Sequence, residues 1–134
     1  MLRNAVNHRL GDQVGGLGGR VYEAFLAPSD AVKPYATVKL PGGAGSAEIG
    51  YAGTTAVEVR LYLDPTTFRD LDVLAQEVLA ALNGQLIADP DDGQVYHLLY
   101  QPGGGDFVDD QKNLIGRLLL FETAAVFEPT TGGG

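Results

Sequence analysis

Residues 57–86, VEVRLYLDPTTFRDLDVLAQEVLAALNGQL, decide the fold of this chain. Apolar and polar residues alternate in the first part of this stretch, which is typical of a strand with one buried face. The apolar positions are Val57, Val59, Leu61 and Leu63. Asp64-Pro65 ends the strand, because proline has no N–H group to donate to a neighbouring strand.

A helix follows this strand directly. Thr67 is a favourable N-cap, and Asp70 places a stabilising negative charge in the first helical turn. Apolar residues then recur every three or four positions, as on one side of an amphipathic helix. They are Phe68, Leu71, Leu74, Ala75, Val78 and Leu82. The sequence therefore predicts a helix over about residues 68–83, closed by Asn83-Gly84 and packed on the sheet that contains the strand.

The other predicted elements complete an α+β fold. A helix with Leu2, Val6 and Leu10 on one side opens the chain, and strands are predicted at residues 20–26, 35–40, 94–101 and 114–127. We expect a mixed or antiparallel sheet of about four to five strands, with the main amphipathic helix and the N-terminal helix packed on one face. The last strand is apolar on both faces at residues 118–121, as in a strand covered on both sides. A single domain is expected over residues 1–128, followed by a flexible tail at 129–134.

Glycine-rich segments separate these elements. Residues 41–55 carry few bulky side chains and are predicted to form a long loop between two strands that pair as a hairpin. Ile49 and Tyr51 are its large apolar residues and are candidate contacts of an assembly loop. Residues 11–19 are predicted to be a flexible connector, since a phosphate loop needs a preceding strand and a following helix. Pro102 and the three glycines after it are predicted to break a strand.

Composition narrows the functional class. The chain has 134 residues, no cysteine and a formal net charge of −8, which argues against nonspecific binding to nucleic acid or anionic lipid. The sequence shows no apolar run long enough to span a membrane and no signal-peptide pattern. Residues 64–110 hold ten acidic residues and a single basic one, Arg69. Such asymmetry is most often a solvated face.

The sequence contains no recognisable catalytic or ligand-binding motif. His8 and His97 fall in different elements, and a lone histidine in a strand is more often structural than catalytic. The acidic turn at residues 89–93 lacks the glycine and glutamate positions of a calcium loop. We therefore predict no enzymatic activity, no cofactor and no metal ion. The tyrosines are predicted to pack on the sheet or, alternatively, to lie at a protein interface.

The order of these elements resembles the tail-terminator (tail-completion) family of long-tailed bacteriophages. The matching motifs are RVY at residues 20–22, which opens a strand after the N-terminal helix, and proline-tyrosine at residues 34–35, which opens the next strand. A third strand then leads into the main helix, and a long strand follows an acidic break. The resemblance covers nearly the whole chain. It implies that the motif residues determine the fold rather than make contacts; these are Arg20, Val21, Tyr22, Pro34 and Tyr35.

The resemblance implies a structural virion protein whose subunits form a six-fold ring. The ring would cap the tail tube, stop its polymerisation and provide the surface on which the head docks. Its partners would be further copies of this chain, the tail tube protein and a head-completion or connector protein, and no membrane. DNA would pass through the ring without specific binding, since acidic side chains repel phosphates. The acidic residues that could line such a channel are Asp89, Asp91, Asp92, Asp106, Asp109 and Asp110.

Two other functional classes remain open. The chain could be another head–tail joining or minor tail protein, or a small-molecule-binding or enzymatic α+β domain. A pocket with converging polar groups would favour the last of these. The terminator hypothesis places the protein in the virion, at the head-proximal end of the tail, and in the host cytoplasm during assembly. It also accounts for the surplus apolar surface of the last strand, part of which a ring would bury.

Overall fold

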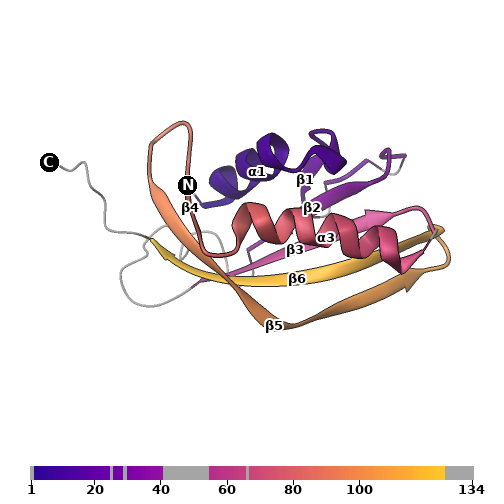
Figure 1. Ribbon diagram of the computed structural model, residues 1–134. Coiled ribbons are helices and arrows are strands. Elements are labelled where there is room, and N and C mark those ends of the chain that lie inside the picture. Colours follow the sequence, from indigo (N-terminus) through magenta and orange to yellow (C-terminus); the bar gives the residue numbers. More distant parts are fainter. Residues whose placement is uncertain (1, 25, 29, 41–54, 66, 126–134) are drawn as a thin grey trace, which may run out of the picture.

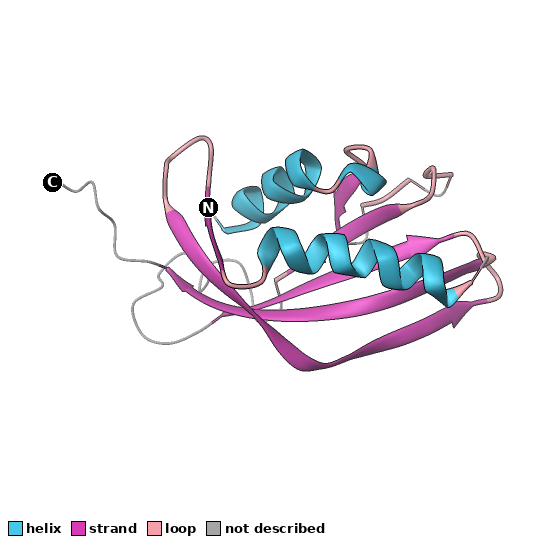
Figure 2. Cartoon of the chain, viewed as in Figure 1, coloured by secondary structure: helices cyan, strands magenta, loops and turns pink. Residues whose placement is uncertain are grey.

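The computed structural model describes residues 2–24, 26–28, 30–40, 55–65 and 67–125 (Figure 1). Two helices lie on one face of a twisted sheet, which has six strands within these residues (Figure 2). The helices are α1, Leu2–Gln13, and α3, Phe68–Leu82, with a 3-10 turn at Gly15–Leu17 after α1. The strands are β1, Val21–Glu23; β2, Tyr35–Lys39; β3, Thr55–Leu63; β4, Gln85–Ala88; β5, Val95–Asp109; and β6, Leu114–Ala125.

The strands lie in the order β1-β2-β3-β6-β5-β4. β1 and β2 run parallel, and every other neighbouring pair is antiparallel. The mixed sheet and the α+β class agree with the sequence prediction, whereas the expected count of four to five strands is wrong. The unforeseen strand is β4, which pairs with the first residues of β5. Its four residues are too few for an alternating pattern to stand out.

The strand–helix unit predicted from residues 57–86 is confirmed as β3 and α3. The four alternating apolar residues of β3 are buried, and so are five of the six apolar residues predicted for the buried side of α3: Leu71, Leu74, Ala75, Val78 and Leu82. Phe68, assigned to the same buried side from its spacing, stands at the start of α3 and is 43% exposed, so this assignment is wrong. Thr67 occupies the N-cap position, but its side chain makes no capping hydrogen bond. Gly84 follows the helix with a φ of +71°, a conformation that favours glycine.

The two short motifs at the start of the chain lie side by side. The Ala36 N–H donates to the Arg20 carbonyl oxygen at 3.1 Å, and Arg20 Nε donates to the Pro34 carbonyl oxygen at 2.9 Å. β1 ends at Glu23, so the strand predicted at residues 20–26 is shorter than expected. Before it, residues 11–19 form the end of α1 and a 3-10 turn, with a helix before and a strand after. The segment thus connects a helix to a strand as predicted, but it is helix and turn with Val14 and Leu17 fully buried, so the expectation that it is flexible is wrong.

β5 does not end at the proline–glycine tract, so the predicted strand break is wrong. The strand pairs with β6 on both sides of an irregularity between Gln101 and Gly105, and it continues to Asp109. Extra residues of this kind form a β-bulge, which bends a strand without ending it. Pro102 is tolerated there because β4 pairs with β5 only up to Leu98, which leaves the proline on an edge of the sheet.

Two glycines make this bulge possible. Gly103 has a φ of +115°, which side chains rarely permit. A Cβ atom at Gly104 would overlap the Leu118 carbonyl group of β6. The strand bows away from α3 at this point (Figure 1). The glycine tract therefore shapes a bend in one long strand.

The hairpin predicted between residues 35–40 and the central strand is confirmed. β2 and β3 pair antiparallel, from Tyr35 opposite Tyr62 to Lys39 opposite Glu58. The predicted loop between them, with Ile49 and Tyr51, lies outside the described residues, as does the predicted tail at 129–134. Both stay predictions.

Candidate assembly surface

One face of the sheet is covered by neither helix (Figure 1). The buried side chains of β3, such as Val59, point toward the helices, so the alternate residues point to the other side. Pairing carries this side across the sheet: Tyr62 of β3 lies opposite Tyr35 of β2 and Gly116 of β6, and Gly116 lies opposite Phe107 of β5. We call this side of β1, β2, β3, β6 and β5 the open face.

Four aromatic rings form a continuous row across the open face. The ring centroids of Tyr22 and Tyr35 are 5.7 Å apart, those of Tyr35 and Tyr62 4.7 Å, and those of Tyr62 and Phe107 5.6 Å. The central pair is stacked and the outer two meet edge-on, geometries that each add about 0.5–1.5 kcal/mol beyond area burial. Burial, followed by the neighbouring Tyr62 and Tyr22 groups, raises the pKa of the Tyr35 phenol. The row is thus a packed, ordered part of the surface.

Gly116 allows this row to cross β6. A Cβ atom at Gly116 would overlap the Phe107 ring and would stand 2.6 Å from the Leu61 carbonyl oxygen. β6 lies between β3 and β5, so any side chain on it at this level would separate Phe107 from Tyr62. A glycine here lets an aromatic ring cover the strand, as glycines in sheets often do where another group approaches closely.

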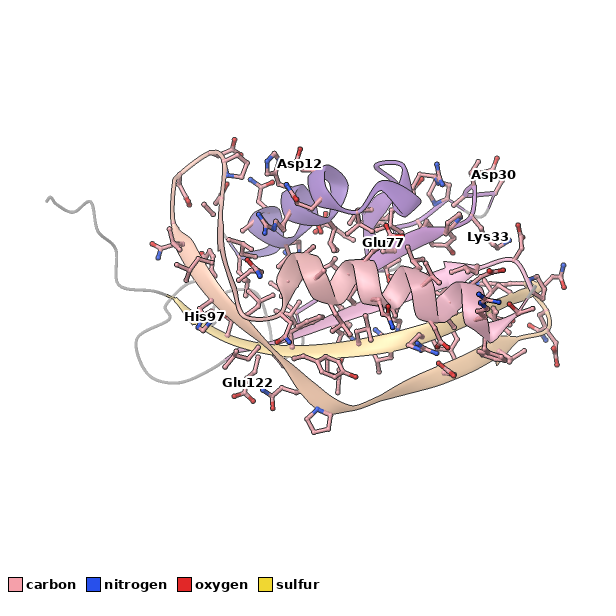
Figure 3. All side chains as sticks on the ribbon, in the orientation of Figure 1. Asp12, Asp30, Lys33, Glu77, His97 and Glu122 are labelled. Carbon is pink, nitrogen blue, oxygen red and sulfur yellow. The ribbon has the colours of Figure 1, made fainter. Side chains whose placement is uncertain are left out.

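The rest of the open face combines leucines with few charges. Leu118 and Leu120 of β6 are half-buried, and Leu99 of β5 is 47% exposed. Within the described strands, the charged residues on this face are Lys39, Glu58, Arg60, Asp109 and Glu122, of which Glu122 is seen pointing away from the helices in Figure 3. Arg60 Nη1 and Glu58 Oε1 form an ion pair at 2.8 Å. With two basic and three acidic residues, this face carries a formal charge of −1, against −8 for the whole chain.

The edges of the sheet are poorly suited to pairing with another strand. β1 has three residues, and turns satisfy part of its outer edge: the Val21 N–H donates to the Gly19 carbonyl, and the Leu26 N–H donates to the Glu23 carbonyl. At the other edge, β4 has only four residues, and the part of β5 that β4 does not cover carries Pro102 and the bulge. Short strands, prolines and bulges are the usual means by which proteins prevent edge-to-edge association. Association through a face is therefore favoured over association through an edge.

A groove of about 470 Å³ lies on the other side of the sheet, between α3 and the second half of β5. Arg117 of β6 lines it and donates from Nη2 to Asp72 Oδ1 at 2.6 Å and from Nε to Asp106 Oδ1 at 2.5 Å. The hydrogen bond to Asp106 is the main cause of the raised pKa of Arg117, and Asp72 adds to it. The Arg117 guanidinium on β6 thus connects α3 to β5. This structural role explains why three charged side chains come together in the groove.

Apolar side chains are exposed on the two elements that border this groove. On α3, Phe68 and Val73 are 43% and 54% exposed; on β5, Tyr100 and Val108 are 40% and 58% exposed. Of these four residues, Tyr100 lines the groove. Exposed apolar side chains of this kind can belong to an interaction site. We call these four residues the helix-side patch. The subunit therefore has two candidate contact surfaces, one on each side of its sheet.

The six acidic residues predicted to line a channel fall into two groups. Asp89, Asp91 and Asp92 lie in the turn between β4 and β5, whereas Asp106, Asp109 and Asp110 lie at the far end of β5 and just beyond it. Most of the length of β5 separates the two groups, so they do not form one acidic face. That either group borders a channel stays a prediction.

Asp89 has a structural role in its turn. Its carboxylate is buried and accepts hydrogen bonds from Asn4 Nδ2 of α1 at 2.6 Å and from the Asp91 N–H at 2.8 Å. Burial alone would raise the pKa of Asp89, but hydrogen-bonding and charged neighbours, these two among them, lower it to about 2. The ionised carboxylate joins α1 to the β4–β5 turn.

The structure brings no histidine into a cluster of ligands. His8 on α1 and His97 on β5 are both exposed. Within the described residues, no group of three or more His, Cys, Asp or Glu side chains is placed to hold a metal ion. In the same part of the chain, no helix has both the length and the apolar character needed to cross a membrane. The lack of enzymatic activity stays a prediction.

Sequence patterns alone do not identify Phe107 and Gly116 as parts of the surface. Both residues are separated from the tyrosines by long stretches of chain, and Phe107 falls in a segment expected to be a polar break. The adjacent Phe107 and Val108, residue types that are enriched in strands, are the one signal that could have indicated a continuing strand.

The fold is similar to that of a solved protein chain from a particle. That chain belongs to a structure described as the virion of a native gene transfer agent (GTA) particle. The TM-score is 0.67 at 17% sequence identity, and the match covers 92% of this chain and 93% of that chain. At 17% sequence identity, the comparison shows only that the two chains share a fold. No protein-family model and no curated protein matches the sequence.

Proposed function

We propose that this chain is a structural protein of a phage-like virion and that it acts there as the tail terminator. The fold shared with a chain of a gene transfer agent virion carries the proposal, since the match extends over nearly the full length of both chains. The order of elements, which resembles the tail-terminator family, gives further support. So do the RVY and proline-tyrosine motifs, which lie together on β1 and β2.

In this role the subunits form a closed ring at the head-proximal end of the tail tube. Rings arise when a surface of one copy binds a different surface of the next copy and the rotation between them closes. The seated ring covers the tube end to which the next tube subunit would add, and this stops polymerisation. The opposite side of the ring binds the head. The acidic character of the chain disfavours adhesion of DNA that passes through the ring.

Deletion of the gene in the particle-producing cell tests this function. Electron microscopy of the lysate should show tails of uncontrolled length and heads that lack tails, and expression of the parent chain in trans should restore complete particles. Tails of normal length beside detached heads would instead support a head-completion role. Short or missing tails would support a minor tail protein. Either of these outcomes would contradict the terminator function.

The position of the protein in the particle gives an independent measurement. A small tag on the chain, labelled in purified particles, should appear at a single position in each particle, the junction of head and tail. A label distributed along the whole tail tube, or confined to the distal tip, would contradict the proposal.

A further inference from the structure

We propose that the open face of one subunit packs against the helix-side patch of a second copy of this chain. The inference rests on the proposed ring and names the contact between its subunits. Each subunit would bind one neighbour through its open face and the other neighbour through its helix-side patch. The contact repeats, between subunits, the packing of helices on a sheet that builds the subunit itself (Figure 2).

A closed ring requires two different contact surfaces on every subunit. This chain has an open face that neither helix covers and, on the opposite side of the sheet, the elements α3 and β5, which flank a groove and carry exposed apolar side chains. Leu99 lies on the open face and is 47% exposed. Val73 belongs to the helix-side patch and is 54% exposed. Contact between these surfaces would remove both kinds of apolar side chain from water.

The open face is large enough for a stable contact. A strand residue covers about 16 Å² of a sheet face, given spacings of about 3.4 Å along a strand and about 4.8 Å between strands. The five strands of the open face, from three residues in β1 to fifteen in β5, thus present about 700 Å². Stable interfaces bury about 800 Å² on each partner. The extent of the open face is thus comparable to one side of a stable interface.

Charge favours an identical chain as the occupant of the open face. Two copies of a chain with a net charge of −8 repel each other, so a contact is favoured where at least one of its surfaces carries little unbalanced charge. The open face meets this condition, since its formal charge is −1 and the Glu58–Arg60 ion pair holds two of its five charges. A phosphate backbone or an anionic membrane would need clustered basic residues, which the described strands do not place on this face.

The aromatic row prepares the open face for binding. The cores of protein interfaces are enriched in aromatic residues and depleted in charged ones. The rings of Tyr35 and Tyr62 are already stacked at 4.7 Å, and Phe107 is held over Gly116. Binding therefore orders few additional side chains, which lowers the entropic cost of the contact.

Cross-linking between single cysteines tests the contact directly. The chain contains no cysteine, so each introduced thiol is unique. A mixture of a Leu99→Cys protein and a Val73→Cys protein, treated with a short bismaleimide, should give a covalent dimer that contains one copy of each. Either variant alone should give no dimer, and the doubly substituted chain should give a ladder of oligomers. The matched control is Val32→Cys, which is 63% exposed on the loop between β1 and β2, outside both surfaces.

A second pair of variants measures how much the open face contributes. Leu99→Arg should weaken self-association at least about 30-fold, because it would bury an unpaired charge in an apolar contact. Val32→Arg, at a position that is also exposed but lies outside both surfaces, should change it by no more than about twofold. Both substitutions are at exposed positions, so circular dichroism should show the parent fold. An effect of Val32→Arg as large as that of Leu99→Arg would overturn the inference.

The cross-linking is carried out on the purified protein and on assembled particles, which separates this inference from the proposed function. A ring at the tail end whose Leu99→Cys and Val73→Cys copies do not link would overturn the contact and leave the terminator function standing. Linked oligomers of a chain absent from the head–tail junction would support the contact and overturn the function. Dimers from Leu99→Cys alone would mean that two open faces meet, which also overturns the inference.

Discussion

Replacement of Gly116 by alanine tests how tightly the aromatic row is packed. At a strand position with free space, this change stabilises a protein by about 0.5–1 kcal/mol, because glycine loses more backbone entropy on folding. At Gly116 the added methyl group overlaps the Phe107 ring and stands 2.6 Å from the Leu61 carbonyl oxygen. Overpacking costs about 1–3 kcal/mol, and the upper half of that range applies because one obstacle is backbone. The net loss of about 1–2 kcal/mol should lower Tm by about 3–10 °C.

Urea unfolding followed by circular dichroism gives the free energy of unfolding of parent and variant. Gly105→Ala is the matched control, because a Cβ atom there meets nothing within 4 Å. It should be neutral or slightly stabilising. In a Phe107→Ala background, the cost of Gly116→Ala should fall by about 1 kcal/mol, since the two residues are in contact. If Gly116→Ala is as stable as Gly105→Ala, the Phe107 ring does not occupy this space, and the assignment of Phe107 to the aromatic row is wrong.

Three further variants test the core, the β4–β5 turn and the groove. Val78→Asp, at a fully buried position of α3, should lose about 3–5 kcal/mol to an unpaired carboxylate. The exposed control Ala80→Asp should lose only about 1 kcal/mol, from its lower helix propensity and its place in the last turn. Equal melting temperatures would mean that the buried face of α3 is misassigned. Asp89, with a lowered pKa, should stabilise the fold above about pH 4 and lose this contribution as the pH falls toward 2. Asp89→Asn should therefore flatten the plot of unfolding free energy against pH between these two values. An unchanged plot would refute the structural role of the Asp89 carboxylate. Arg117→Met should cost about 1 kcal/mol at low salt in urea unfolding, and less when Asp72→Asn is also present; an equal cost in both backgrounds would exclude a working ion pair.

The centre of the fold could be predicted because its signals are local. The two-residue period of β3 and the three-to-four-residue period of α3 each follow from the geometry of one element. In the structure the same residues face the core, from Val57 to Leu63 and from Leu71 to Leu82. No knowledge of the partner strands was needed to assign either face.

β4 and the second half of β5 depend on distant residues, so local patterns were insufficient. In β4 only Ile87 is well buried, while Leu86 is 62% exposed, so the apolar residues of this strand do not share one face. Proline and glycine mark turns and bulges alike. The bulge exists because β6 pairs with β5 on both sides of the glycine tract, and that pairing is not visible in residues 102–105.

The aromatic row illustrates how strongly the candidate surface depends on register. The sequence could predict that tyrosines on strands pack on the sheet or lie at an interface. It could not predict which of their rings contact one another. Tyr35, Tyr62 and Phe107 come together because three strand pairings place them at one level on one face. A shift of one residue in any of these pairings would send a ring to the opposite face.

β6 carries apolar side chains on both of its sides, which bears on how the subunit assembles. On its helix side, Ile115, Leu119 and Phe121 are buried in the core. A strand whose other side met only water would carry polar residues there, as β3 does with its charged pair. β6 instead presents leucines, flanked by the aromatic row, on a face from which both helices are absent. Short edge strands, Pro102 and the bulge oppose the addition of another strand to the sheet, so we expect a partner to bind over this face and not at an edge. In the contact that we propose, this partner is a second copy of the chain, which offers the exposed apolar side chains of its α3 and β5. One side of the sheet stabilises the subunit, and we propose that the other side binds the next subunit of a ring.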